Sequence, residues 1–130
     1  MNVPVELKYT KSDEWVRVEG SIATIGISDF AQDQLSDIVF WEAMVDVGEE
    51  LEADSVVASL ESVKAAGDVN TPVGGKIVEL NSELDAAPEI VNSDPFGAAW
   101  MVKIEISDPS ELDSLLDADA YGKHCEERSE

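Results

Sequence analysis

The chain has 130 residues, of which 29 are Asp or Glu and only 8 are Lys or Arg, so its formal net charge is -21 at pH 7. That length suits one domain with a substantial core, and a hydrophobic share of 44% argues against wholesale disorder. So acidic a chain repels nucleic-acid phosphates and anionic lipid, and we therefore expect neither nucleic acid nor a membrane among its partners. The charge fits two interpretations equally well: attraction to basic protein surfaces, or simple solubility in a salty habitat.

Cysteine and histidine are too scarce to build a disulfide or a metal site. Cys125 is the only cysteine and His124 the only histidine, which is too few for a zinc centre. No apolar run approaches the length of a membrane span, and the N-terminus carries neither a signal-peptide nor a transit-peptide pattern. We therefore expect no metal, and expect that any leader has been removed from this chain.

Alternating apolar and polar residues predict a β-hairpin early in the chain. Its strands are residues 15–19 and 22–27, separated by a Gly-Ser turn. Ser28 is a good N-cap for a short helix that reaches Leu35, and residues 37–42 return to strand composition.

The middle of the chain is predicted to contain further strands around one lysine. An acidic loop over residues 49–54 precedes the apolar run 56–60, and residues 68–72 follow Lys64. After a break at two adjacent glycines, residues 77–80 form another strand-like segment.

The last part of the chain is predicted to be one strand followed by helices. Residues 100–106 alternate as a strand does, and Asp108 then caps a helix with Pro109 at its first position and Glu111 completing a capping box. A second short helix is expected from residue 117 to about 126, with a frayed acidic tail beyond it.

Many short strands separated by Gly, Pro and Asn predict a mainly β fold, a small sandwich or barrel with helices mainly at its ends. We expect Trp15, Trp41 and Trp100 to belong to its core. Residues 92–95 are predicted to form a turn stabilised by Asn and Asp side chains.

Lys64 lies between two predicted strands and is followed by Ala65, Ala66 and Gly67. At a hairpin tip its amine would project into solvent, and small neighbours would allow an enzyme surface to approach. A primary amine can form an amide, and the four-carbon stem adds reach, so this lysine could anchor a swinging cofactor arm. On geometry alone a solvated surface charge is the simpler interpretation. The motifs around Lys64 must therefore decide between a surface charge and a cofactor anchor.

The segment around Lys64 resembles the lipoylation segment of the glycine cleavage H proteins. The flanking residues that the resemblance assigns to lipoyl attachment are Glu61, Ser62, Val63 and Ala65. Other segments resemble the same family in the same order: 14–16, 24–27, 31–32, 37–40, 91–95, 100–104 and 114–116, with Tyr121. The resemblance extends from about Leu7 to Tyr121, so we expect a single lipoyl-carrier domain over residues 1–130, with 122–130 as a C-terminal tail.

The resemblance implies a hybrid barrel-sandwich of two antiparallel sheets with short flanking and C-terminal helices, and a lipoyl group joined by an amide to Lys64. It implies no catalysis by the chain itself. The implied role is to carry an aminomethyl group from a glycine decarboxylase (P protein) to an aminomethyltransferase (T protein), and reducing equivalents to dihydrolipoyl dehydrogenase (L protein). Lipoyl-attaching enzymes are the remaining implied partners, and we expect a monomer.

A carried aminomethyl group would be lost to water on an exposed arm, so the loaded arm should fold into a cleft. The ammonium of the cargo would require a carboxylate there, and exclusion of bulk water would strengthen the attraction. Glu14 is the first candidate and Asp68 the second, although each could be only part of an acidic surface. Asp13, Phe30 and Gln34 stand where the family often has His, which puts a histidine contact with the arm in doubt.

Two other functions are possible alternatives to the carrier role. A lipoyl relay protein, which donates lipoyl groups to other acceptors, would need the same residue. An enzyme would require a nucleophile–base pair, a metal cluster or a phosphate loop, none of which the sequence offers. Residues 20–24 and 121–127 resemble plant mitochondrial members, so we expect the mitochondrial matrix and a role in photorespiration, with the bacterial cytoplasm as the alternative.

Overall fold

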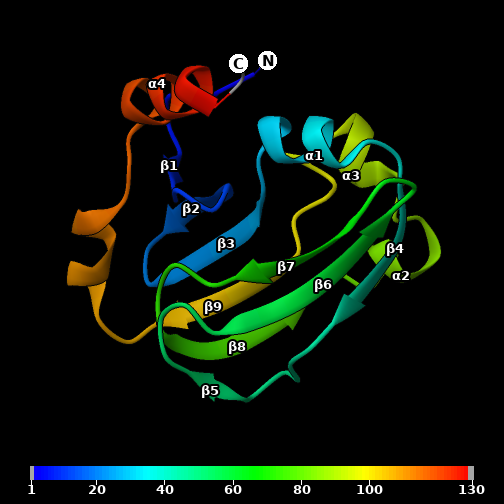
Figure 1. Ribbon diagram of the computed structural model, residues 1–130. Coiled ribbons are helices and arrows are strands. Elements are labelled where there is room, and N and C mark those ends of the chain that lie inside the picture. Colours follow the sequence, from blue (N-terminus) through cyan, green and yellow to red (C-terminus); the bar gives the residue numbers. More distant parts are fainter. Residues whose placement is uncertain (1, 129–130) are drawn as a thin grey trace.

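Two antiparallel sheets form the body of the molecule (Figure 1). The computed structural model describes residues 2–128. The strands are β1 (Lys8–Tyr9), β2 (Glu14–Glu19), β3 (Ile22–Ile27), β4 (Ile38–Ala43), β5 (Glu50–Leu51), β6 (Val56–Ser62), β7 (Ala66–Asn70), β8 (Gly75–Leu80) and β9 (Val102–Ile106). One sheet has the order β1-β2-β3-β9-β8-β5 and the other the order β4-β6-β7, which confirms the predicted mainly β fold.

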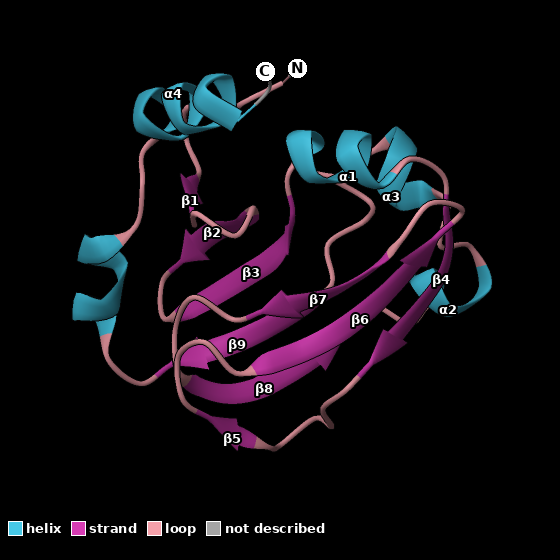
Figure 2. Cartoon of the chain, viewed as in Figure 1, coloured by secondary structure: helices cyan, strands magenta, loops and turns pink. Residues whose placement is uncertain are grey.

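The helices are short and lie around the sheets rather than between them, as Figure 2 shows. They are α1 (Asp29–Leu35), α2 (Glu83–Ala86), α3 (Ile90–Ser93), the 3₁₀ helix η1 (Pro109–Ser114) and α4 (Ala118–Arg128). None of the helices in the described part of the chain is long and apolar enough to cross a membrane.

The predicted first hairpin is confirmed as β2 and β3, which pair from Glu14 with Ile27 to Glu19 with Ile22. Gly26 of β3 lies under the indole of Trp15, where an added Cβ would approach the ring to 2.8 Å. The Trp15 ring is fully buried and its Nε1 donates to the Pro95 carbonyl at 2.9 Å. A small residue in β3 therefore admits the large one from β2.

The main core lies between the two sheets and takes residues from both. Ile25, Ile77 and Ile104 come from the larger sheet and Trp41 and Leu60 from the smaller, and all five are buried. Removal of such side chains from water is the main favourable term in folding.

The expected core positions of the tryptophans are confirmed for Trp15 and Trp41 but only partly for Trp100. Trp100 precedes β9 and is half-buried, with the Lys103 ammonium 4.8 Å from its ring centroid. The predicted strand was therefore two residues too long at its start, and Trp100 packs at the edge of the molecule, in contact with a cation.

A smaller cluster attaches α4 to β1. The rings of Tyr9 and Tyr121 stack with centroids 4.6 Å apart, and Leu7 and Cys125 are buried in the same cluster. The backbone of Tyr9 also pairs with Leu116, just before α4. The C-terminal helix is thereby fixed beside the N-terminal strands, and Figure 1 shows α4 over β1.

Helix caps predicted from the sequence are confirmed in two places and wrong in one. Ser28 accepts the Ala31 N–H at 3.2 Å, and Asp108 accepts the Ser110 N–H at 3.1 Å. Glu111 does not complete a capping box, because its Oε1 accepts the Gly74 N–H at 2.9 Å instead. The carboxylate thus joins η1 to the β7–β8 turn.

The turn predicted at residues 92–95 is confirmed only at its end, where the Asp94 side chain accepts the Ala98 N–H at 2.8 Å. It is wrong at Asn92, which lies in α3 and whose side chain makes long-range hydrogen bonds. Its Oδ1 accepts the Ile38 N–H at 2.8 Å, and its Nδ2 donates to the Ser36 carbonyl at 2.8 Å and to Gln32 Oε1 at 2.9 Å. Asn92 therefore holds the loop between α1 and β4.

Candidate functional site

Lys64 stands at the tip of the hairpin formed by β6 and β7, as predicted. The two strands pair from Val56 with Asn70 to Glu61 with Ala66, which leaves the lysine in the connecting turn. In Figure 1 this hairpin projects toward α1. The lysine is exposed, and its Nζ donates to the Gln34 carbonyl at 3.3 Å, near the end of α1.

Ser62 shapes the turn that presents the lysine. Its Oγ accepts the N–H groups of Lys64 at 3.1 Å and Ala65 at 2.9 Å, and its own N–H donates to the Ala65 carbonyl at 2.8 Å. Hydroxyl-to-backbone bonds of this kind favour turns over continued strands. The turn is further joined to the α1–β4 loop, because the Val63 N–H donates to the Asp37 carbonyl at 3.0 Å.

The residues flanking Lys64 leave it accessible. Glu61, Val63 and Ala65 are exposed, and Ser62 is half-buried. Among the residues that the structure describes, the Lys64 ammonium forms no salt bridge within 4.0 Å. The amine is therefore available for an acylating enzyme, at the expense of one weak hydrogen bond to a carbonyl.

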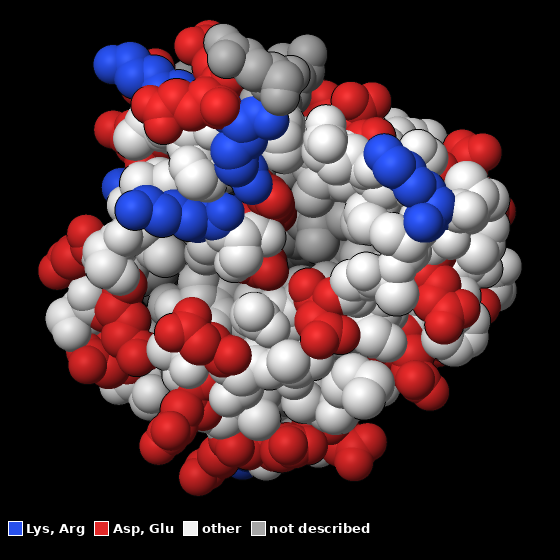
Figure 3. All heavy atoms as spheres, in the orientation of Figure 1, with Lys and Arg blue, Asp and Glu red and all other residues white. Residues whose placement is uncertain are grey.

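A cleft of about 210 Å³ lies beside the hairpin. Its lining residues come from the β1–β2 turn, β3, α1, β6 and β7, and they are Ser12, Asp13, Ile27, Ala31, Gln34, Leu35, Leu60, Gly67 and Asp68. Gln34 both lines this cleft and accepts the Lys64 amine, so the cleft begins where the lysine side chain ends. Figure 3 shows the surface hollowed between the side of α4 and the side of α1.

The chemistry of the cleft fits an aliphatic arm with a cationic end. Ile27, Leu35 and Leu60 give it an apolar wall, while Ser12 and Asp68 supply an acceptor hydroxyl and an exposed carboxylate. A hydrocarbon chain gains from the apolar wall, and an ammonium gains from the carboxylate. The two candidates for cargo binding occupy different places, since Asp68 lines the cleft and Glu14 does not.

Glu14 lies behind the cleft wall rather than in it, and the residue as a whole is only 1% exposed. Its Oε1 accepts hydrogen bonds from Thr10 Oγ1 at 2.6 Å and Ser12 Oγ at 2.5 Å, and its Oε2 accepts the Asn70 N–H at 3.2 Å. Burial raises the pKa of Glu14, and the hydroxyl donors oppose that rise. The carboxylate reaches the cleft only through the hydroxyl of Ser12.

Asp13 adopts a left-handed backbone conformation with φ of 78° and is held from the opposite end of the chain. Its carboxylate accepts the Tyr121 hydroxyl at 2.8 Å and both terminal nitrogens of Arg128, at 2.5 and 3.1 Å. The Arg128 guanidinium also lies 4.4 Å from the ring centroid of Phe30. Asp13 and Phe30, two of the three positions where the resembling family often has His, thus share one arginine.

Arg128 is a residue of the site that sequence analysis missed. It is the last described residue of α4, and its partner Asp13 is 115 residues away in sequence. The third position without histidine, Gln34, lines the cleft and receives the lysine. No local pattern around Arg128 indicates these contacts.

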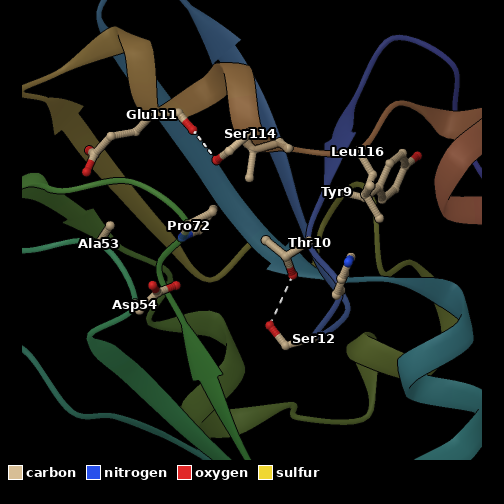
Figure 4. Close-up of a pocket in the computed structure, with 11 residues that line it drawn as sticks. Tyr9, Thr10, Ser12, Ala53, Asp54, Pro72, Glu111, Ser114 and Leu116 are labelled. Atoms are coloured by element: carbon tan, nitrogen blue, oxygen red, sulfur yellow. Dashed lines mark hydrogen bonds between the residues drawn. The ribbon is translucent and has the colours of Figure 1, made fainter. Parts of the chain in front are cut away.

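A second cavity, of about 510 Å³, lies on the other side of the Thr10–Ser12 turn (Figure 4). Its labelled residues converge from the N-terminal turn, the loop at Asp54, Pro72 and η1, and Ser12 lines this cavity as well as the cleft. Glu111 on its wall is already bonded to Gly74. The part of the chain that the structure describes contains no group of three His, Cys, Asp or Glu side chains placed to hold a metal ion.

Comparisons with known proteins agree over nearly the whole chain. The family model described as glycine cleavage H-protein matches residues 7–128. The chain is 50% identical over 126 residues to the glycine cleavage system H protein of Symbiobacterium thermophilum, covering 97% of this chain and 98% of that protein. It is 52% identical over 118 residues to the one of Thermotoga maritima, covering 91% and 94% respectively.

A solved structure is similar in fold as well. The crystal structure of a glycine cleavage system H protein from Mycobacterium marinum superposes with a TM-score of 0.83 at 29% identity, covering 93% of this chain and 97% of that one. These relatives are bacterial, so the expected resemblance to plant mitochondrial members, and with it the mitochondrial matrix and photorespiration, is not supported.

Proposed function

The chain belongs to the glycine cleavage H-protein family, and on that premise we propose that Lys64 is the residue to which its lipoyl group is joined. The protein is a non-catalytic lipoyl carrier of the glycine cleavage system. It takes the aminomethyl group from the P protein to the T protein and delivers reducing equivalents to the L protein.

The observation that carries the assignment of Lys64 is an exposed amine at a hairpin tip, directly beside a cleft with an apolar wall. When bound, the lipoyl group supplies a disulfide that can accept the aminomethyl group. The residues of this chain supply the anchor, the turn and the shelter. We assign Glu61, Ser62, Val63 and Ala65 to the attachment segment, with Ser62 holding the turn through its hydrogen bonds.

We propose that the cleft receives the loaded arm and keeps its cargo from water. Asp68 lines the cleft and faces the ammonium of the cargo directly. Glu14 acts from behind Ser12, whose hydroxyl is bonded to the Glu14 carboxylate. In this arrangement the charge of the cargo is met by one exposed carboxylate and one buried carboxylate, in a site partly removed from bulk water.

We further propose that the carrier is one domain over residues 1–130 and that it works in the cytoplasm of a prokaryotic cell. The first proposal is supported by a family match that begins at residue 7 and ends at 128. The second is supported by the bacterial origin of the relatives.

Lipoylation in vitro tests the assignment. Incubation of the protein with lipoate, ATP and a lipoate–protein ligase should raise its intact mass by one lipoyl group, and Lys64→Arg should abolish the gain completely. Lys76→Arg, at an exposed lysine of β8, is the matched control and should be modified like the wild type. Peptide mapping that finds the lipoyl group on another lysine would contradict the assignment.

A further inference from the structure

Three large apolar side chains are exposed beside Lys64, although the surface of the chain is otherwise rich in carboxylates. Val39 is 54% exposed, Phe40 45% and Val63 68%. They are neighbours in space, because Phe40 pairs with Glu61 across β4 and β6, and the Asp37 carbonyl accepts the Val63 N–H. We call these three residues the apolar collar.

The collar results from an irregularity in β4 and not from ordinary alternation. The register of β4 against β6 shifts between Ile38 and Phe40, so that Val39 and Phe40 are both exposed while Ile38 and Trp41 are both buried. A bulge of this kind redirects side chains at the edge of a sheet. Strict alternation would bury Phe40 on the same side as Ile38.

Carboxylates surround the collar. Asp37 precedes Val39, Glu42 follows on β4, and Glu61 is the partner of Phe40 on β6, and all three are exposed. Figure 3 shows basic side chains gathered near α4, and one standing apart over the β6–β7 hairpin. An apolar patch bordered by negative charge fits a partner whose own apolar patch is bordered by Lys or Arg.

The short length of the lysine side chain indicates which partner enzyme would contact the apolar collar. Before modification the reacting atom is Nζ, which stands on a stem of only four carbons and is bonded to Gln34. An enzyme that acylates this atom must bring its active site against the residues next to Lys64. The enzymes that later act at the far end of the attached arm do not have to approach the protein surface so closely.

We propose that the apolar collar of Val39, Phe40 and Val63 is the docking surface for the enzyme that attaches the lipoyl group. This inference rests on the proposed role of Lys64. The docked enzyme takes the amine from the Gln34 carbonyl, and the neutral nitrogen attacks the carbonyl carbon of a lipoyl adenylate made from lipoate and ATP. The new C–N bond forms, the bond from that carbon to the phosphate oxygen breaks, AMP leaves with the electron pair, and the nitrogen loses a proton.

Steady-state lipoylation of collar variants tests the proposal. With lipoate, ATP and a lipoate–protein ligase, Phe40→Ser and Val39→Ser should each raise the KM for the carrier about tenfold and leave kcat within about twofold. Val47→Ser is the matched control, because Val47 is 61% exposed and lies in the loop before β5, and its KM should equal that of the wild type. Val63→Ser gives a third collar variant.

Direct binding provides a readout that is independent of turnover. Lys64→Arg cannot be acylated, so its calorimetric Kd for the ligase can be compared with that of Lys64→Arg combined with Phe40→Ser, which should be about tenfold weaker. Replacement of Asp37 by Asn together with Glu42 by Gln should reduce the salt dependence of that Kd. Far-UV circular dichroism and urea midpoints identify any variant that fails to fold, and the other two collar variants then carry the test.

Each outcome has a separate meaning. Collar variants that are lipoylated at Lys64 with wild-type KM would overturn the docking proposal and leave the role of Lys64 intact. An equal rise of KM in Val47→Ser would overturn it too. A rise of KM toward the glycine decarboxylase but not toward the ligase would reassign the collar to that partner. Lipoylation of the wild type at another lysine would remove the proposed role of Lys64, and with it the basis of the docking proposal.

Discussion

The lysine hairpin and the turn that carries Glu14 are opposite kinds of structure. Lys64 is exposed, and its turn is formed by short-range hydrogen bonds from one serine. Glu14 is buried, and its turn is joined to β7 through Asn70 and to α4 through Asp13. The difference fits the proposed roles, which require access at Lys64 and require fixed position and exclusion of water at the end that would receive the arm.

β7 connects the two regions and sets their separation. The strand begins just after Lys64 and ends at Asn70, whose N–H is bonded to Glu14. Gly67 and Asp68, between these ends, line the cleft. A single strand of five residues therefore extends from the turn of Lys64 to the residue that holds the Glu14 carboxylate, and its regular backbone fixes their separation.

The largest expected effect separates the two regions by function. Glu14→Ala should release the aminomethyl cargo to water about tenfold faster, because the buried carboxylate behind Ser12 is gone, which corresponds to about 1.4 kcal/mol. Lipoylation of Lys64 should proceed as in the wild type, since the turn that presents Lys64 shares none of the hydrogen bonds of Glu14, whose contact with the hairpin is at Asn70, the far end of β7. Formaldehyde and ammonia released from the loaded protein measure the first quantity, and intact mass the second.

Asp68→Asn is the companion to this variant, since Asp68 lines the cleft directly. An unchanged rate of cargo loss in Glu14→Ala, combined with a faster rate in Asp68→Asn, would assign the ammonium to Asp68 alone. Slower lipoylation in Glu14→Ala would show that the two regions are not independent.

The second effect concerns the long-range support of the Glu14 turn. Arg128→Met removes the ion pair with Asp13, whose side chains are 33% and 17% exposed, and should reduce the free energy of unfolding by about 1 kcal/mol after allowance for solvent screening. Lys123→Met, at an exposed lysine of the same helix, is the control and should change stability by less than about 0.5 kcal/mol. Urea unfolding at two salt concentrations measures both.

A double-mutant cycle makes this prediction specific to the pair. Asp13→Asn and Arg128→Met should be less damaging together than the sum of the single changes, because both remove the same interaction. Additive effects would mean that Arg128 acts through its contact with Phe30 instead.

Local patterns were sufficient for the parts of the fold that depend on neighbours in sequence. Alternation placed the β2–β3 hairpin, and Ser28 was identified as a cap from its residue type and position. Lys64 was placed between two predicted strands, with small residues after it, and its proposed chemistry came from ordered resemblance over most of the chain. These features are predictable because each is determined within a few residues.

Contacts between distant segments could not be predicted in the same way. Asn92 and Glu111 have residue types suited to local turns and caps, yet their side chains bond to Ile38 and Gly74. Arg128 and Asp13 are 115 residues apart. The bulge in β4 exposes Phe40 against its apparent alternation. In each case the position of the side chain depends on a partner that is distant in sequence, which no local pattern reveals.

The smallest expected effect is a pH dependence that only the buried region should show. Burial raises the pKa of Glu14 above its ordinary value of 4.5, so the native state holds this proton more tightly than the unfolded chain does. The stabilisation from Glu14 is then fully present below that ordinary value and is lost as pH rises through the native pKa. Glu14→Gln cannot titrate, so the stability of the wild type relative to this variant should fall as pH rises above the ordinary Glu pKa of 4.5.

Urea midpoints of the two proteins at matched pH values measure that difference. The nearby charged groups are common to both proteins, so their contributions to the pH dependence cancel to first order; they are Asp13, Asp68 and Arg128. A relative stability that rises with pH would mean that the donors Thr10, Ser12 and Asn70 outweigh burial and keep Glu14 charged in the empty carrier. The sign of this pH dependence therefore distinguishes two states of the Glu14 region. If burial dominates, the proposed cargo ammonium would have to work against the raised pKa of Glu14; if the hydrogen-bond donors dominate, the empty carrier already favours the charged carboxylate behind Ser12.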